Sequence, residues 1–120
     1  MLGDLDQTLL DVLLHLALAY VVALPLAWER DKDARTAGIR TFPLVSLGAC
    51  SYLLLARELF GDSPEAQARI LQGLLTGMGF IGGGAILKTE RSVHGVATAA
   101  SLWNTGAIGA AVAFDRIVLA

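Results

Sequence analysis

Apolar residues along this chain fall into four long segments that are separated by short polar stretches. They run from about Leu9 to Trp28, from about Thr41 to Ala56, from Ile70 to Leu87 and from about Val96 to Phe114. The second is the shortest, and it reaches Phe60 if Arg57 and Glu58 extend their charged ends to the interface. A helix of about 18 or more apolar residues can cross a bilayer, and no strand-type alternation is present. We therefore expect an all-α integral membrane bundle of about four transmembrane helices, forming a single domain over residues 1–120.

The third segment is unusually rich in glycine. Its 18 residues, 70–87, carry no charge, and six of them are glycine. Glycine weakens a water-exposed helix by about 1 kcal/mol relative to alanine, whereas in a membrane small residues let helix backbones approach closely. Gly73 and Gly77 form one pair with the spacing of a helical turn, and Gly79 and Gly83 form another. We expect both pairs to pack on other helices, either within the chain or across a homodimer.

Composition also favours a membrane protein. The chain is 55% hydrophobic and 17% charged, whereas soluble domains have about 45–50% apolar and about 25% charged residues. The net charge of −2 provides no basic surface for nucleic acid. Asp4 and Asp6 precede the first apolar segment without any Lys or Arg. A secretory signal needs a positive start, so we expect this segment to remain as a helix.

Lysine and arginine are unevenly divided between the two sides of such a bundle. The stretches 29–40 and 88–95 hold Arg30, Lys32, Arg35, Arg40, Lys88 and Arg91, whereas the opposite side holds Arg57, Arg69 and Arg116. Positive residues are enriched on the cytoplasmic side of membrane proteins. We therefore expect the two stretches to be cytoplasmic and both ends of this chain to lie outside.

Ionisable groups within the apolar segments are candidates for an ion pathway or for polar pairing. Asp11 and His15 lie one turn apart, and Glu29 follows Asp11 by eighteen residues, so both carboxylates project from the same side of a helix. Hydration at the two interfaces explains the carboxylates equally well, and a hydrogen bond within the helix explains His15. Carboxylates suit Mg²⁺, so Asp11 and Glu29 are candidate metal ligands. We also expect Arg40 to pair with Glu29 at the same membrane depth.

The fourth segment carries a weakly polar face. Thr98, Ser101 and Thr105 recur at helical spacing, and Asn104 adds an amide nearby. Such residues form hydrogen bonds between membrane helices, and substrate contact is the alternative for Thr98, Ser101 and Asn104. The sequence contains no Ser/His/Asp set, no Cys/His cluster and no phosphate-binding loop, so we expect neither an enzyme nor a bound cofactor.

Four stretches together resemble the MgtC/SapB membrane family. They are WERD at residues 28–31, AGIRT at 37–41, LTGMGFIGGGAIL at 75–87 and HGVATAASLWNTGAIG at 94–109. Their order and spacing match over about residues 9 to 114. One departure is Ala97, which replaces one of two threonines in the family's fourth-helix pattern. The resemblance implies a multi-pass protein of the bacterial inner membrane that is linked to magnesium.

Two functions are compatible with that resemblance. One is transport or homeostasis of a cation, with Mg²⁺ as the candidate substrate or ligand. The other is regulation, without transport, of another membrane complex such as ATP synthase. Four short helices make a thin wall for an ion path, so both favour a homo-oligomer, with a dimer preferred, surrounded by membrane lipid. Relatives commonly continue into a fifth helix, so this chain is either a minimal member or one truncated at Ala120.

Overall fold

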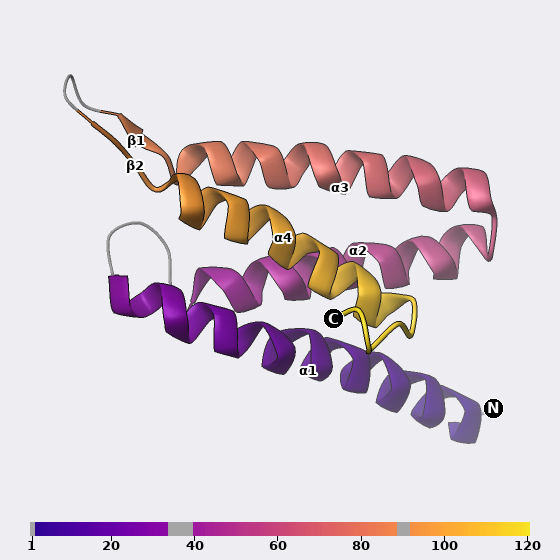
Figure 1. The fold of residues 1–120 in the computed structure, drawn as a ribbon. Helices are drawn as coiled ribbons and strands as arrows, with labels where there is room; N and C mark the ends of the chain where they lie inside the picture. The colour runs from indigo at the N-terminus through magenta and orange to yellow at the C-terminus, as the bar shows by residue number, and fades with distance from the viewer. Residues whose placement is uncertain (1, 34–39, 89–91) are drawn as a thin grey trace.

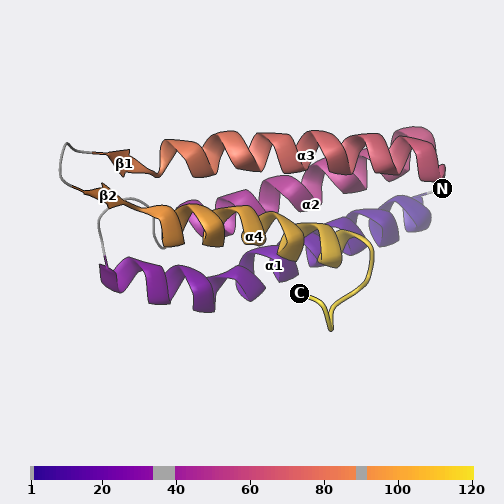
Figure 2. The same cartoon turned by 45° about the horizontal axis from the view of Figure 1, so that its top comes forward.

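The computed structural model describes residues 2–33, 40–88 and 92–120, which form a bundle of four helices (Figure 1). The helices are α1 (Leu2–Asp33), α2 (Thr41–Phe60), α3 (Pro64–Gly84) and α4 (Val96–Ala113). Two short antiparallel strands, β1 (Leu87–Lys88) and β2 (Val93–His94), lie between α3 and α4. The turn between α2 and α3 lies at one end of the bundle, and the strand pair lies at the other (Figures 1 and 2). We call these the turn end and the strand end.

The all-α membrane-type bundle predicted from the sequence is confirmed. Within the described ranges three helices are long and apolar enough to cross a membrane, namely residues Leu2–Glu29 of α1, all of α2 and all of α4. With 21 residues α3 is long enough but is not among these three, since Arg69, Gln72 and Thr76 lower its mean hydropathy. Its membrane crossing therefore stays a prediction.

Local sequence explains the tight turn between α2 and α3. Gly61 ends α2 with φ of 62°, a left-handed conformation that glycine adopts without steric cost. Ser63 then caps α3, since its side chain accepts a hydrogen bond from the Ala66 backbone at 3.4 Å. Pro64 follows at the first helical position, where its missing N–H has no consequence. Thus α3 begins six residues before the predicted segment, and it ends at Gly84 rather than Leu87.

Small residues make the closest contacts between helices at the centre of the bundle, which also buries larger apolar side chains. Ala19, Ala23 and Ala27 recur every four residues along α1 and are fully buried. Ser46 of α2 donates a hydrogen bond from its hydroxyl to the Ala19 carbonyl oxygen at 2.7 Å. On α4, Gly109 lies so close to α2 that a Cβ atom there would overlap the Ser46 carbonyl oxygen. These contacts bring three helix backbones together, as expected where packing rather than water drives association.

The glycines that we expected to be packed are not those that contact other helices. The close contacts are made by Gly82 against Ala99, Gly106 against Met78 and Gly109 against Ser46. Gly73, Gly77, Gly79 and Gly83 are exposed, and a Cβ atom at any of them would meet no atom of the described residues within 4 Å. The reason is helical period: these four flank the exposed side of α3, away from its buried stripe. The prediction that these glycines pack within the chain is therefore wrong, and the prediction that they pack across a homodimer is not tested by any contact within one chain.

Candidate functional site

His15 is the centre of a polar cluster where α1, α2 and the end of α4 meet. The side chain of His15 is only 11% exposed. Its Nδ1 lies 2.8 Å from the backbone carbonyl oxygen of Asp11, and its Nε2 lies 2.7 Å from Oδ1 of Asp115. A carbonyl and an ionised carboxylate can only accept hydrogen bonds, so this arrangement is satisfied when both ring nitrogens donate.

The turn that follows α4 brings Asp115 to His15. The Asp115 N–H donates to the Val112 carbonyl at 3.1 Å, and the Arg116 N–H donates to the Ala111 carbonyl at 2.7 Å. This pair of bonds is the Schellman pattern, which usually places glycine in the left-handed position after the helix. Here Asp115 occupies that position with φ of 59°. Aspartate is one of the few non-glycine residues that adopt it readily.

Arg57 adds a positive charge from α2. Its Nη1 donates to the Ala113 carbonyl oxygen at 2.9 Å and lies 3.7 Å from Oδ2 of Asp115. The hydrogen bond with His15 lowers the pKa of Asp115, and the charges of His15, Arg57 and Arg116 lower it further. Asp115 thus lies between the His15 imidazole and the Arg57 guanidinium, and both favour its ionised form. The cluster fastens the end of α4 to both α1 and α2.

Asp11 and Glu29 do not converge in the structure. Asp11 lies beside His15, with Oδ1 at 3.5 Å from the ring Nδ1, and is 70% exposed. Glu29 lies exposed near the opposite end of α1. Eighteen residues of helix separate the two carboxylates by about 27 Å. They cannot bind one ion within a single chain, and the described residues contain no group of three or more side chains placed to hold a metal.

The expected ion pair between Glu29 and Arg40 is not seen, which corrects that prediction. Both residues are exposed, and among the described residues no ion pair joins them. The buried stripe of α1 passes through Ala27, and Glu29 is two residues further on, which is more than half a turn away. Its carboxylate therefore projects from the outer side of the bundle.

The polar residues of α4 bond within their own helix rather than between helices. Ser101 donates to the Ala97 carbonyl at 2.8 Å, and Thr105 donates to the Ser101 carbonyl at 2.7 Å. Asn104 is exposed and Thr98 is half-buried. The structure thus brings His15 together with Asp11 and leaves the other predicted polar residues apart from that cluster.

Sequence reasoning missed Arg57 and Asp115. A signal was present, because opposite charges follow the second and fourth apolar segments, whose ends meet on the same side of an up-down bundle. What hid the cluster is the length of α1, which extends past the end of α4 at the turn end (Figure 1). His15 is therefore near the middle of its own helix but level with the end of α4.

Comparison with known proteins identifies the chain. The model of the MgtC family matches residues 16–120. This chain belongs to the MgtC family. The match includes α2, α3, α4 and most of α1, so it contains Arg57 and Asp115 of the polar cluster but neither His15 nor Asp11.

Several curated proteins are similar to this MgtC-family chain. Protein SrpB of Synechococcus elongatus is 38% identical over 110 residues, which cover 82% of this chain and 60% of that protein. Protein MgtC of Brucella abortus is 36% identical over 94 residues, covering 78% of this chain and 39% of that protein. The Escherichia coli K12 protein named "Putative magnesium transporter YhiD" is 31% identical over 105 residues, covering 82% of this chain and 49% of that protein.

The chain thus spans about half the length of these relatives, with coverage from 39% to 60%. No solved structure matches it. The name of the Escherichia coli protein mentions magnesium, and none of the three names says how the family acts. The arrangement of side chains in this chain therefore has to carry any argument about mechanism.

Proposed function

We propose that this chain is a multi-pass protein of the bacterial inner membrane that serves magnesium homeostasis by binding other membrane helices. Membership of the MgtC family and the name of the Escherichia coli relative support the connection with magnesium. Three helices that are apolar enough to span a bilayer support the location in a membrane. The exposed side of α3 supports the mode of action.

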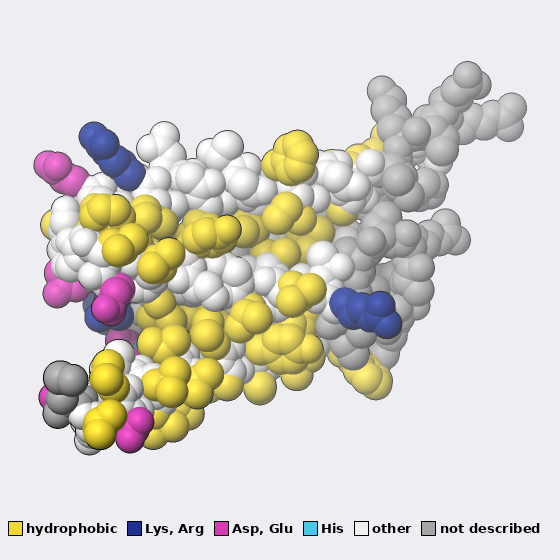
Figure 3. All heavy atoms as spheres, turned by 180° about the vertical axis from the view of Figure 1, so that it is seen from behind, with side chains coloured by type: hydrophobic (Ala, Val, Ile, Leu, Met, Phe, Trp, Pro, Cys, Tyr) yellow, Lys and Arg dark blue, Asp and Glu magenta, His cyan; other side chains and the backbone are white. Residues whose placement is uncertain are grey.

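That exposed side is poorly suited to lipid and well suited to another helix. It presents Gly73, Gly77, Gly79 and Gly83 with Gln72 and Thr76. In Figure 3, α3 lies along the upper edge and is mostly white, above bands of yellow hydrophobic side chains. Phe80 projects from the same side and is 85% exposed, whereas the exposed glycines around it leave the backbone accessible and offer lipid few side-chain atoms. The same surface lets a second backbone approach closely. We take it to be the docking face, and we infer that a second copy occupies it in a symmetric dimer.

Transport of Mg²⁺ is the second candidate function, and the name of the Escherichia coli relative favours it. The centre of one bundle is filled by Ala19, Ala23 and Ala27 on α1 and by the contact between Gly109 and Ser46. If the protein transports Mg²⁺, the hydrated ion would therefore cross the membrane between two copies rather than through the centre of one bundle. Uptake of Mg²⁺ by vesicles that contain the folded protein would support transport over regulation.

Bulk on the docking face should separate the copies. We expect Gly77→Leu and Gly83→Leu each to convert a dimer to a monomer in mild detergent, because a leucine side chain would hold the two backbones apart and lose dispersion contacts. The unfolding temperature of each monomer should be close to that of the parent. The measurement is light scattering coupled to size-exclusion chromatography.

Gly48→Leu is the matched control for that experiment. Gly48 lies on α2, and a Cβ atom there also meets no atom of the described residues within 4 Å. This variant should keep the mass of the parent. If both α3 variants also keep that mass, the exposed glycines of α3 do not join two copies.

A further inference from the structure

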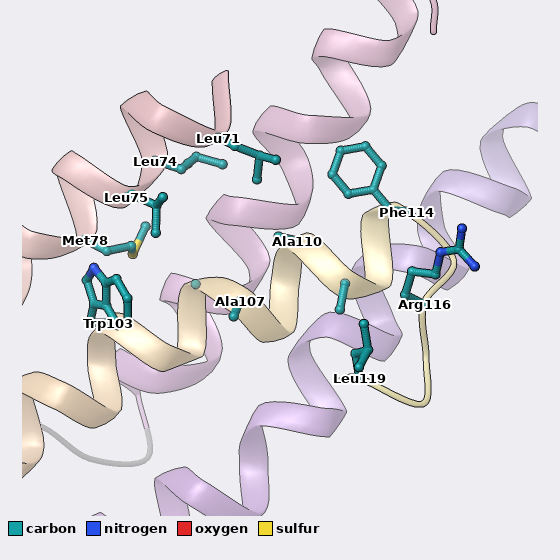
Figure 4. Close-up of a pocket in the computed structure, with 12 residues that line it drawn as sticks. Leu71, Leu74, Leu75, Met78, Trp103, Ala107, Ala110, Phe114, Arg116 and Leu119 are labelled. Carbon is teal, nitrogen blue, oxygen red and sulfur yellow. The ribbon is translucent and has the colours of Figure 1, made fainter. Parts of the chain in front are cut away.

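An apolar groove runs along the surface between α3 and α4. Its volume is about 390 Å³, and its walls include Leu75 and Met78 of α3 and Trp103 and Ala107 of α4. Figure 4 shows Trp103 toward one end of the groove and Arg116 toward the other. Arg116 is the only charged residue among those that line it. The groove therefore combines a long apolar floor with a single cation.

The turn after α4 explains why Arg116 faces this groove. Asp115 is directed toward α1 and α2, where it binds His15 and lies near Arg57. Arg116 follows directly in the Schellman turn and lines the groove between α3 and α4 instead. Within the part of the chain that the structure describes, Arg116 forms no ion pair. Its guanidinium is exposed and available to an external anion.

The length of the groove matches one leaflet of a bilayer. Trp103 lies ten residues before Ala113, the last residue of α4, which corresponds to about 15 Å along the helix. The hydrocarbon core is about 30 Å thick, so a single acyl chain spans about 15 Å. A lipid whose phosphate lies at the turn end would thus place the far part of its chain beside Trp103.

We propose that this groove binds an anionic phospholipid, with one acyl chain along α4 and its phosphate on Arg116. Guanidinium groups bind phosphate oxygens through two parallel hydrogen bonds. A zwitterionic headgroup supplies its own cation to that phosphate, whereas an anionic headgroup does not. The charge of Arg116 therefore selects anionic over zwitterionic lipid, and the apolar walls bind the chain of either.

Quenching of Trp103 by brominated lipid tests the proposal. The full chain carries Trp28→Phe, which leaves Trp103 as its one tryptophan. It is placed in phosphatidylcholine vesicles with equal amounts of acyl-brominated phosphatidylglycerol or acyl-brominated phosphatidylcholine. We expect an apparent preference of about fivefold for the anionic quencher, which corresponds to about 1 kcal/mol for one arginine near the surface.

Two substitutions distinguish the effect of the Arg116 charge on lipid binding from the effect of the apolar groove. Arg116→Gln should abolish the preference and leave quenching by brominated phosphatidylcholine in place. Ala107→Phe should fill the groove and lower quenching by both lipids, with Arg116 intact. Arg69→Gln is the matched control, since Arg69 is exposed near the turn end but does not line the groove. It should keep the fivefold preference.

Three results would overturn the lipid site. One is equal quenching by the two lipids in the parent, and another is a preference that survives Arg116→Gln. The third is weak quenching by both lipids that rises as the protein is diluted in excess lipid, because a second copy would then cover the groove. Circular dichroism establishes that each variant is folded, and if Arg116→Gln is not, Ala107→Phe decides the outcome alone.

Discussion

Gly109→Ala should destabilise the bundle by about 2 to 3 kcal/mol, the upper part of the range of about 1 to 3 kcal/mol for overpacking a core. The new Cβ atom would overlap the Ser46 carbonyl oxygen and lie 3.0 Å from the Ala49 Cβ atom. Both neighbours belong to the buried face of α2, and an oxygen of the helix backbone cannot rotate away as a side chain does. The two helices must therefore move apart. Chemical unfolding in detergent micelles, followed by circular dichroism, measures this change.

The matched control is Gly48→Ala, on α2. Both substitutions replace glycine by alanine within a helix, so each gains about 1 kcal/mol of intrinsic helix propensity. At Gly48 the methyl group enters open space, so that variant should be as stable as the parent or more so. If Gly109→Ala is as stable as Gly48→Ala, then α2 and α4 are not in close backbone contact.

His15 and Asp115 should be coupled by about 1 kcal/mol in a double-mutant cycle. Hydrogen bonds to charged groups contribute about 1.5 to 3 kcal/mol when they are shielded, and Asp115 is 65% exposed, which reduces that value. The variants are His15→Ala and Asp115→Asn, since asparagine also accepts the left-handed conformation after α4. A parallel cycle with Arg57→Gln and Asp115→Asn should give less, because that pair is 3.7 Å apart and exposed.

Acid should remove the contribution of Asp115. The pKa of Asp115 is lower in the folded chain than its ordinary value of 3.8, so ionised Asp115 favours the folded state. That contribution is complete above pH 3.8 and is lost as the pH falls through the lowered pKa. The parent should therefore lose stability relative to Asp115→Asn on acidification. A difference between the two that does not change from neutral pH down to acidic pH would contradict the ionised pair.

The sequence predicted the helices well because membrane spans are encoded locally. Helices α2 and α4 begin at Thr41 and Val96, where the second and fourth apolar segments were expected to start. Helix α1 begins at Leu2 rather than about Leu9, since Asp4 and Asp6 do not interrupt a helix near its start. The end of α3 at Gly84 was not predicted, because the strand pair that follows depends on pairing between two separate stretches.

The candidate site was predicted only in part, because it depends on how helices align. His15 and Asp11 are neighbours on one helix, so their spacing was visible. The partner of His15 is 100 residues away, and that contact depends on how far α4 extends along α1. The glycines show the same limit. Spacing identified small residues, but only the orientation of α3 decides that Gly82 is buried and Gly77 is exposed.

The central claim is that this protein acts by docking onto other membrane helices and does not conduct Mg²⁺. Vesicles loaded with a Mg²⁺-sensitive dye test this claim most directly. The parent protein is reconstituted after circular dichroism has shown that it is folded and light scattering that it is dimeric. An ionophore added at the end verifies the dye response. We predict no Mg²⁺ entry above that of protein-free vesicles, because small residues such as Ala23 and Gly109 close the centre of each bundle and the docking faces of the two copies lie in contact in the proposed dimer. Saturable Mg²⁺ entry that increases with the amount of folded protein would contradict the account.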